Sequence, residues 1–137
     1  MPFTYHTTVQ LHQTDAAGLI FFSRIFELAH DAYQSWMNAI GFGLDKMLAD
    51  DVYLLPLVHA EADYKNAFHI GDPITIHLKV ARIGETSFSL DYDLARQEVL
   101  HVRVKTVHVF MAKTSGKAKP LPEQLVCAMK PFLESAS

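Results

Sequence analysis

Residues 13–22 of the chain read Gln13-Thr14-Asp15-Ala16-Ala17-Gly18-Leu19-Ile20-Phe21-Phe22. This stretch places one acid in a turn of small residues, directly before a long amphipathic segment. A carboxylate there lies near the start of a helix, where backbone N–H groups lack partners and the helix dipole is positive. Such N–H groups polarise a carbonyl, while the carboxylate attacks it or activates water. Asp15 is therefore a candidate catalytic residue, with a turn or capping role as the alternative.

The segment that follows has the apolar spacing of an amphipathic helix. Its apolar positions, spaced by three and four, are Phe22, Ile25, Phe26, Ala29, Ala32, Tyr33, Trp36, Met37 and Ile40. Polar residues fill the opposite face, so the pattern predicts a helix of about five turns with one broad apolar stripe. Gly41 is the expected stop, and a short helical piece is expected over about 44–49. At this spacing Trp36, Phe26 and Met37 are interpreted as core residues.

In the rest of the chain, apolar and polar residues alternate with period two. Residues 3–12 predict one strand, and strands are also predicted over about 53–64, 73–82, 86–95 and 98–111. Alternation of this kind is typical of an antiparallel sheet with one packed face. A long apolar helix must be covered, and the sheet is the large surface available. The sequence therefore predicts an α+β fold in which a sheet curls around a helix.

Composition limits the class of protein. A length of 137 residues suits one domain, and a net charge of −3 gives no case for nucleic acid as a partner. No apolar run approaches the roughly 20 residues of a membrane span. The N-terminal residues lack a signal-peptide pattern, and the single cysteine, Cys127, agrees with a reducing cytosol. Residues 99–122 contain basic side chains but no acid, which suits either a solvated strand and loop or a site for a phosphorylated ligand.

The order of elements, with Asp15 before the helix, resembles the hotdog-fold acyl-CoA thioesterases of the 4-hydroxybenzoyl-CoA thioesterase type. The resemblance covers roughly residues 3 to 133, and its motif is Thr14 to Phe22. Three further stretches are similar to the 1,4-dihydroxy-2-naphthoyl-CoA hydrolases of quinone biosynthesis. They are His30-Asp31-Ala32-Tyr33-Gln34-Ser35-Trp36, Leu55-Pro56-Leu57-Val58-His59-Ala60 and Gly71-Asp72.

The resemblance implies that residues 1–137 form a single hotdog domain, with a long central helix wrapped by a curled antiparallel sheet. It also implies hydrolysis of an aromatic acyl-CoA, best assigned as 1,4-dihydroxy-2-naphthoyl-CoA in menaquinone or phylloquinone biosynthesis. Other aromatic or short-chain acyl-CoAs are alternative substrates. A non-catalytic acyl-CoA or acyl-carrier binding module is the alternative from another class, although a pure binder has no need of Asp15.

Roles for several residues follow from the same resemblance. Asp15 acts as nucleophile or general base, and the backbone N–H of Phe22 faces the thioester oxygen. Gly18 permits close approach of the backbone to the substrate. His30 stands where many family members carry an acid, so a contact to the hydroxyls of a bicyclic acyl group competes with a structural role. His59 has either a structural role or a role in orienting Asp15 or the substrate.

The Gly84 turn is the expected site of the CoA nucleotide. Arg82 and Ser87 flank this turn, and the corresponding region of the family lies near the nucleotide. Further candidates are Arg103, Lys105, Lys113 and Lys117. No cofactor is expected, and no metal, because the histidines show no metal-ligand spacing with a supporting acid. The resemblance also implies a cytoplasmic homodimer or homotetramer, with sheets joined edge to edge, active sites at the interface and no membrane insertion.

Overall fold

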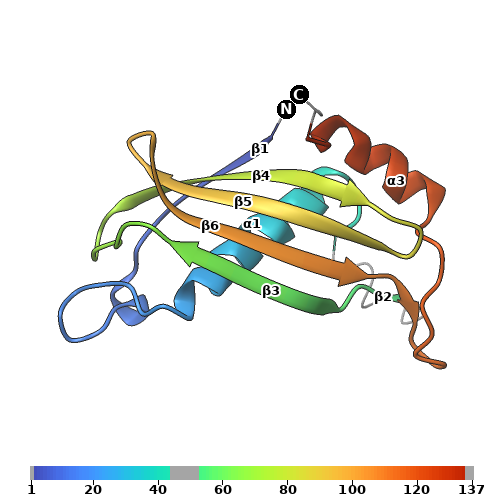
Figure 1. The fold of residues 1–137 in the computed structure, drawn as a ribbon, viewed down its shortest axis with the longest axis horizontal. Helices are drawn as coiled ribbons and strands as arrows, with labels where there is room; N and C mark the ends of the chain where they lie inside the picture. Colours follow the sequence, from blue (N-terminus) through green and yellow to red (C-terminus); the bar gives the residue numbers. More distant parts are fainter. Residues whose placement is uncertain (1, 44–52, 135–137) are drawn as a thin grey trace.

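The computed structural model describes residues 2–43 and 53–134 of the chain. The described residues form an α+β arrangement of helices and mostly antiparallel strands (Figure 1). In chain order the elements are β1 (Phe3–Thr8), the 3-10 helix η1 (Leu11–Gln13), α1 (Arg24–Ala39), β2 (Tyr53–Leu54), β3 (Leu57–Tyr64), β4 (Pro73–Ile83), β5 (Ser87–Arg96), β6 (Val99–Val109), β7 (Met111–Ala112), α3 (Glu123–Met129) and the 3-10 helix η2 (Lys130–Phe132).

The main sheet has five strands in the order β1-β4-β5-β6-β3, and every neighbouring pair is antiparallel. Along β4, β5 and much of β6, buried side chains alternate with more exposed ones. This alternation gives the sheet one packed face and one outer face. β3 differs from these strands, because it lies at an edge of the sheet and leaves nearly all of its side chains exposed.

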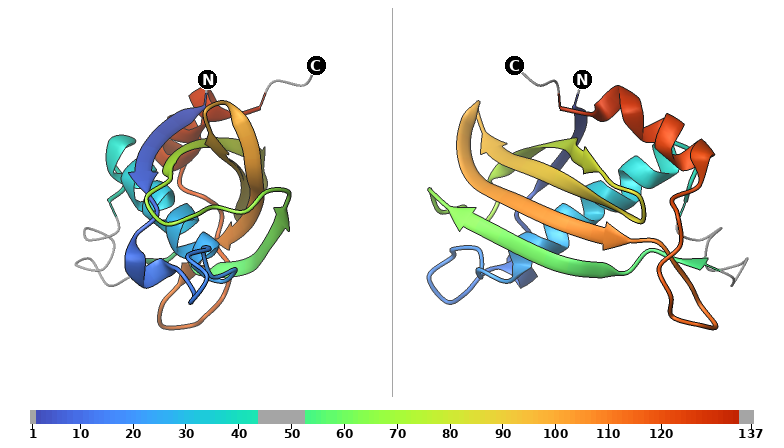
Figure 2. Two further views of the ribbon diagram at one scale, coloured as in Figure 1. Left: turned by 90° about the vertical axis from the view of Figure 1, so that its left-hand side faces the viewer. Right: turned by 45° about the vertical axis from the view of Figure 1, so that its right-hand side comes forward.

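α1 covers the packed face, and the strands curve around it (Figure 2). The helix has 16 residues, and its buried side chains are Ile25, Leu28, Ala29, Ala32, Tyr33, Trp36 and Met37. The core position predicted for Trp36 and Met37 is thereby confirmed, since both side chains are 0% exposed. The predicted stop at Gly41 is also confirmed. Gly41 has a φ of +89°, and the Phe42 N–H donates to the Met37 carbonyl at 2.9 Å.

Two of the predicted strands are shorter than the sequence pattern indicates. The strand predicted over 3–12 ends at Thr8, because the residues after it form the 3-10 helix η1. The start of this helix is stabilised by the Gln10 N–H, which donates to the Gln13 Oε1 at 2.9 Å. The strand predicted over 53–64 is divided at Pro56, since proline has no N–H to donate to a ladder. Its first part, β2, pairs with β7 and not with the main sheet.

The C-terminal helix α3 was not predicted from the sequence. Its side chains Leu125 and Met129 are buried. The following residues hold the C-terminal segment on β4, where the Glu134 N–H donates to the Val80 carbonyl at 2.8 Å. The helical piece predicted around 44–49 lies outside the described residues. Within the described part of the chain, no helix has the length and apolar character needed to cross a membrane.

Candidate active site

The turn that carries Asp15 is closed by backbone hydrogen bonds. The Asp15 Oδ1 accepts the N–H groups of Ala17 at 2.9 Å and Leu19 at 3.2 Å. The backbone of Asp15 forms two more hydrogen bonds within the turn. Its N–H donates to the Leu19 carbonyl at 2.8 Å, and its carbonyl accepts the Gly18 N–H at 3.0 Å. Gly18 has a φ of +77°, which side chains with a Cβ rarely adopt. The exposed Asp15 carboxylate is thus fixed by one oxygen, while its Oδ2 accepts no hydrogen bond from the described residues.

A second segment, residues 66–72, holds this turn in place. The Ile20 N–H donates to the Phe68 carbonyl, and the Ile70 N–H donates to the Gly18 carbonyl, both at 2.9 Å. Phe68 is itself fully buried. The Asp15 turn is therefore anchored to the core through a segment about 50 residues further along the chain, a distance in sequence that periodicity does not reveal.

Asp72 fixes the shape of that second segment. Its Oδ2 accepts the His69 N–H at 2.7 Å, and its Oδ1 lies 3.5 Å from the Arg96 Nε. The side chain of Asp72 is only 14% exposed. Hydrogen bonds from a backbone N–H to a carboxylate are among the stronger ones in proteins. Asp72 thus fixes the segment 66–72, and this segment in turn holds the Asp15 turn in place.

The chain enters α1 through a turn in which the Phe22 N–H is left unpaired among the described residues. The Phe21 N–H donates to the Gln13 carbonyl at 2.8 Å, and the Phe21 carbonyl accepts the Arg24 N–H at 2.9 Å. The Phe22 carbonyl accepts the hydroxyl of Tyr64. Among the described residues, the Phe22 N–H between these groups has no hydrogen-bond partner. It lies at the helix start, where a free N–H group favours a negatively charged oxygen.

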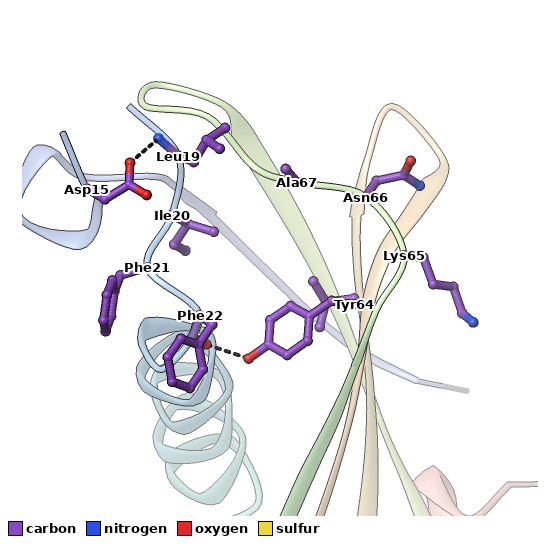
Figure 3. A pocket seen from close by; sticks show the side chains of 10 residues that line it. Asp15, Leu19, Ile20, Phe21, Phe22, Tyr64, Lys65, Asn66 and Ala67 are labelled. Carbon is purple, nitrogen blue, oxygen red and sulfur yellow. Dashed lines mark hydrogen bonds between the residues drawn. The ribbon is translucent and has the colours of Figure 1, made fainter. Parts of the chain in front are cut away.

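A pocket of about 460 Å³ opens between the Asp15 turn and the end of β3 (Figure 3). It is lined by Asp15, Leu19, Ile20, Phe21, Phe22, Tyr64, Lys65, Asn66, Ala67 and Val102. Asp15 and Tyr64 come from its two sides, and the side chains of Lys65 and Asn66 point away from it. Partial burial raises the pKa of Tyr64, which keeps its hydroxyl protonated and able to donate.

Two predicted substrate residues lie apart from this pocket within one chain. His30 is exposed on α1, and the nearest aromatic ring, that of Tyr33, is 6.3 Å away between centroids. His59 lies on β3, where its Nε2 is 3.2 Å from the Glu61 Oε1. The structure therefore brings Gly18 and Phe22 to Asp15, but it does not bring His30 or His59 there.

A second hollow of about 310 Å³ contains both residues predicted to bind the nucleotide. It is lined by Ala81, Arg82, Gly84, Ser87, Phe88, Ser89, Lys105 and Val107. Strand pairing places Arg82, Ser89, Val107 and His59 in one row across four strands. Sequence reasoning missed Ser89, whose place beside Arg82 follows only from the register of β4 and β5.

The core below this second hollow contains a polar chain that the sequence analysis also missed. The Thr106 Oγ1 lies 3.1 Å from the Tyr92 Oη and 3.2 Å from the His108 Nε2. The His108 ring stacks on Tyr33 and Phe88, with centroids 4.3 and 5.3 Å apart. Burial lowers the pKa of His108 to about 4. The neutral imidazole is therefore a structural part of the core, with no contact to the Asp15 pocket.

Comparisons with known proteins agree with the fold. A family model described as the thioesterase-like superfamily matches residues 9–129. A 1,4-dihydroxy-2-naphthoyl-CoA hydrolase from Synechocystis is 33% identical over 123 residues, which cover 88% of this chain and 89% of that protein. The enzyme of the same name from Rippkaea orientalis is 33% identical over 129 residues, covering 92% of this chain and 94% of the relative.

Solved structures show the same arrangement of the chain. The crystal structure of a 1,4-dihydroxy-2-naphthoyl-CoA thioesterase from Synechocystis has a TM-score of 0.89 and 32% identity, covering 95% of this chain and 96% of that one. The dynemicin thioesterase has a TM-score of 0.91 at 16% identity, covering 99% of this chain and 100% of that one, which supports the fold alone. Because the family model and relatives above 30% identity both span most of its length, the chain belongs to the thioesterase-like superfamily.

Proposed function

We propose that the protein hydrolyses the thioester of an aromatic acyl-CoA, with 1,4-dihydroxy-2-naphthoyl-CoA of quinone biosynthesis as the substrate. The observation that carries this proposal is the Asp15 carboxylate, fixed by the Ala17 and Leu19 N–H groups at the side of an apolar pocket. Relatives that match nearly the whole chain bear the name of that hydrolase. A thioester hydrolase needs a carboxylate at the carbonyl and a donor for its oxygen.

In the proposed reaction, the thioester oxygen accepts the unpaired N–H of Phe22. The free Oδ2 of Asp15 then either attacks the carbonyl carbon or removes a proton from an attacking water. The first route gives a mixed anhydride that water later cleaves, and the second adds water directly. In both, the carbon–sulfur bond breaks and the CoA thiolate takes up a proton. Single-turnover hydrolysis in H₂¹⁸O identifies the anhydride route when water cleaves the anhydride at the Asp15 carbonyl, because the label then appears in the Asp15 carboxyl.

The acyl group is proposed to occupy the pocket beside Asp15. Its walls are mostly aliphatic and aromatic, and its volume of about 460 Å³ is in the range of small-molecule sites. Gly18 brings the backbone close to the thioester. His30, exposed on α1, is proposed to contact hydroxyl groups of the acyl ring.

The nucleotide of CoA is proposed to bind in the second hollow. Arg82 and Lys105 supply charge for phosphates, while Ser87 and Ser89 supply hydroxyl donors. Within one chain, the Gly84 turn and the Asp15 turn lie at opposite ends of the sheet (Figure 1). A single acyl-CoA is therefore proposed to use Asp15 of one subunit and Arg82 of the partner subunit.

The edge strand β3 provides the contact that this proposal needs. Leu57 and Val58 on this strand are 38% and 54% exposed, and Tyr64 is 47% exposed. An unpaired strand edge favours pairing with a second strand. Antiparallel pairing of β3 across a two-fold axis sets the Tyr64 end of one subunit beside the Leu57 end of the other. His59, in one row with Arg82, then lies at the interface.

The proposed particle is a homodimer, or a homotetramer of two such dimers, of a single hotdog domain over residues 1–137 with α1 as its central helix. It needs no cofactor or metal, because water and the named groups suffice for hydrolysis, and we assign it to the cytoplasm. Light scattering should report at least twice the chain mass of 15.4 kDa. A fully active monomer would contradict the shared site.

The activity is tested with a thiol-release assay over a panel of acyl-CoAs, ranked by kcat/KM. A hydroxynaphthoyl-CoA should rank above benzoyl, phenylacetyl and short-chain acyl-CoAs. Preference for a short-chain acyl-CoA would support thioester hydrolysis but would overturn the assignment of an aromatic substrate. Tight binding of the panel without any thiol release would indicate a non-catalytic binding module instead.

A further inference from the structure

Tyr64 joins the two sides of the pocket. It is the last residue of β3, and its hydroxyl donates to the carbonyl of Phe22, 42 residues away at the entry to α1 (Figure 3). This hydrogen bond crosses from the edge strand to the turn that precedes the helix. It is a direct side-chain contact between these two elements, and the pattern of the sequence gives no sign of it.

The hydrogen bond satisfies a carbonyl that α1 does not use. The helix begins at Arg24 with Ser23 as its N-cap, so Phe22 lies outside it and its carbonyl has no place in the helical ladder. The Phe26 N–H donates to the Ser23 carbonyl at 3.3 Å. The Phe22 carbonyl accepts the Tyr64 hydroxyl. No side chain caps this end of α1.

The peptide groups on both sides of the Phe22 Cα are therefore fixed. The Phe21–Phe22 group, which carries the Phe22 N–H, is held through the Phe21 carbonyl by the Arg24 N–H, and the Phe22–Ser23 group is held through the Phe22 carbonyl by Tyr64. The Phe22 N–H itself has no partner among the described residues. Removal of the Tyr64 hydroxyl would free the Phe22–Ser23 group, so that Phe22 and its N–H would be held from one side only.

We propose that Tyr64 is a positioning residue, whose hydroxyl directs the Phe22 N–H at the thioester oxygen. The inference rests on the proposed function, in which that N–H stabilises the developing negative charge. A donor contributes most when it is already aimed at the position of the oxyanion. Small errors in such alignment are costly, because the transition state tolerates little displacement.

The test compares Tyr64→Phe with Tyr53→Phe. Each change removes one hydroxyl and keeps the ring, and the two tyrosines are 47% and 45% exposed. Tyr53 stacks on Phe110 and pairs with Ala112, away from the Asp15 turn. We expect Tyr64→Phe to lower kcat about tenfold with KM changed less than twofold, a smaller loss than the roughly 10²–10³ for removal of a whole donor. Tyr53→Phe should leave both constants unchanged.

A spectroscopic readout separates positioning from general loosening of the pocket. In an Asp15→Asn background, bound hydroxynaphthoyl-CoA stays intact, and its thioester C=O stretch moves to lower frequency when a donor polarises it. Adding Tyr64→Phe should shrink this shift, whereas adding Tyr53→Phe should not. An undiminished shift in a folded Tyr64→Phe protein would overturn the inference even if kcat falls. Normal turnover by Asp15→Asn alone would instead overturn the proposed function.

Discussion

At one end of the sheet, the Asp15 carboxylate is held by two backbone N–H groups beside an apolar pocket, whereas at the other end Arg82 and Lys105 extend into solvent from the outer face. The first end depends on contacts between distant parts of the chain, such as Ile20 with Phe68. The second is a hairpin turn in which the Gly84 N–H donates to the carbonyl three residues later at 2.7 Å.

The difference matches the chemistry that each end is proposed to perform. Bond cleavage requires a fixed charge and a fixed donor in a largely apolar setting, where electrostatic effects are strong. Phosphate binding tolerates mobile, hydrated cations, and such contacts are screened by salt. Changes at the Asp15 end should therefore lower kcat, while changes at the Gly84 end should raise KM.

The largest effect is expected for Asp15→Asn. The amide oxygen can still accept the N–H groups of Ala17 and Leu19, so circular dichroism and thermal unfolding should remain nearly unchanged. The variant loses the negative charge that attacks or activates water, and kcat should fall about a thousandfold, within the range for loss of a general base. Thiol release measures the loss. Asp93→Asn, on the outer face of β5, is the matched control and should keep full kcat.

The next effect concerns the core below the Gly84 end, where His108 is 1% exposed. Burial lowers its pKa to about 4, while an unfolded histidine titrates near 6.5. Between these two pKa values, the unfolded chain therefore binds a proton at His108 that the folded chain does not bind. The free energy of unfolding should fall as the pH drops from about 6.5 to 4, by about 3 kcal/mol from this group. Urea unfolding at several pH values measures the slope.

The control for this slope is a pair of histidine variants. His108→Gln should flatten the pH dependence between 6.5 and 4, because the titrating group is gone. His6→Gln, an exposed position on β1, should leave the slope as in the unchanged protein. Equal slopes for His108→Gln and the parent would show that other groups control acid stability.

A smaller effect is expected at Asp72, which supports the Asp15 end indirectly. Asp72→Ala removes the acceptor of the His69 N–H and should lower the free energy of unfolding by about 1.5–3 kcal/mol, the range for a hydrogen bond to a charged group. Loosening of residues 66–72 should also lower kcat several-fold, since this segment holds Gly18 and Ile20. Asp72→Asn keeps an acceptor oxygen and should lose less of both. Full kcat in the destabilised Asp72→Ala protein would show that the segment 66–72 does not affect catalysis.

The sequence predicted what depends on local periodicity. The apolar stripe of α1 and the alternation of β4, β5 and β6 follow directly from spacing, because each buried face recurs with the period of its element. Asp15 was found for a related reason: its turn and the helix after it are adjacent in the chain. These features need no knowledge of which distant segments meet.

The missed features all depend on long-range contacts or on short segments. The hydrogen bond of Tyr64 to Phe22 spans 42 residues, and Ser89 joins Arg82 only through strand register. α3 has seven residues, too few for a clear helical period. Both strands of the β5–β6 hairpin were predicted, but the type of its turn was not: Gln97 and Glu98 have φ of +50° and +67°, values that favour glycine and give no turn signal in these residue types.

The smallest effect is expected for Arg82→Ala at the Gly84 end. Arg82 is exposed, so its contact with a CoA phosphate is screened by salt and contributes modestly. KM for the CoA thioester should rise several-fold, about 1 kcal/mol of binding free energy, with kcat little changed. The rise should shrink at high salt, since the charges involved are solvated.

A pantetheine thioester provides the decisive control for Arg82, because it keeps the thioester and lacks the nucleotide. Arg82→Ala should leave KM for this shorter substrate close to that of the parent protein. Arg103→Ala, whose side chain is engaged by Asp93 at 3.1 Å on the outer face, should not reproduce the effect on the CoA thioester. An equal rise of KM for both substrates in Arg82→Ala would contradict the binding of the nucleotide at this end of the sheet. Arg82 would then be only a surface residue of the turn.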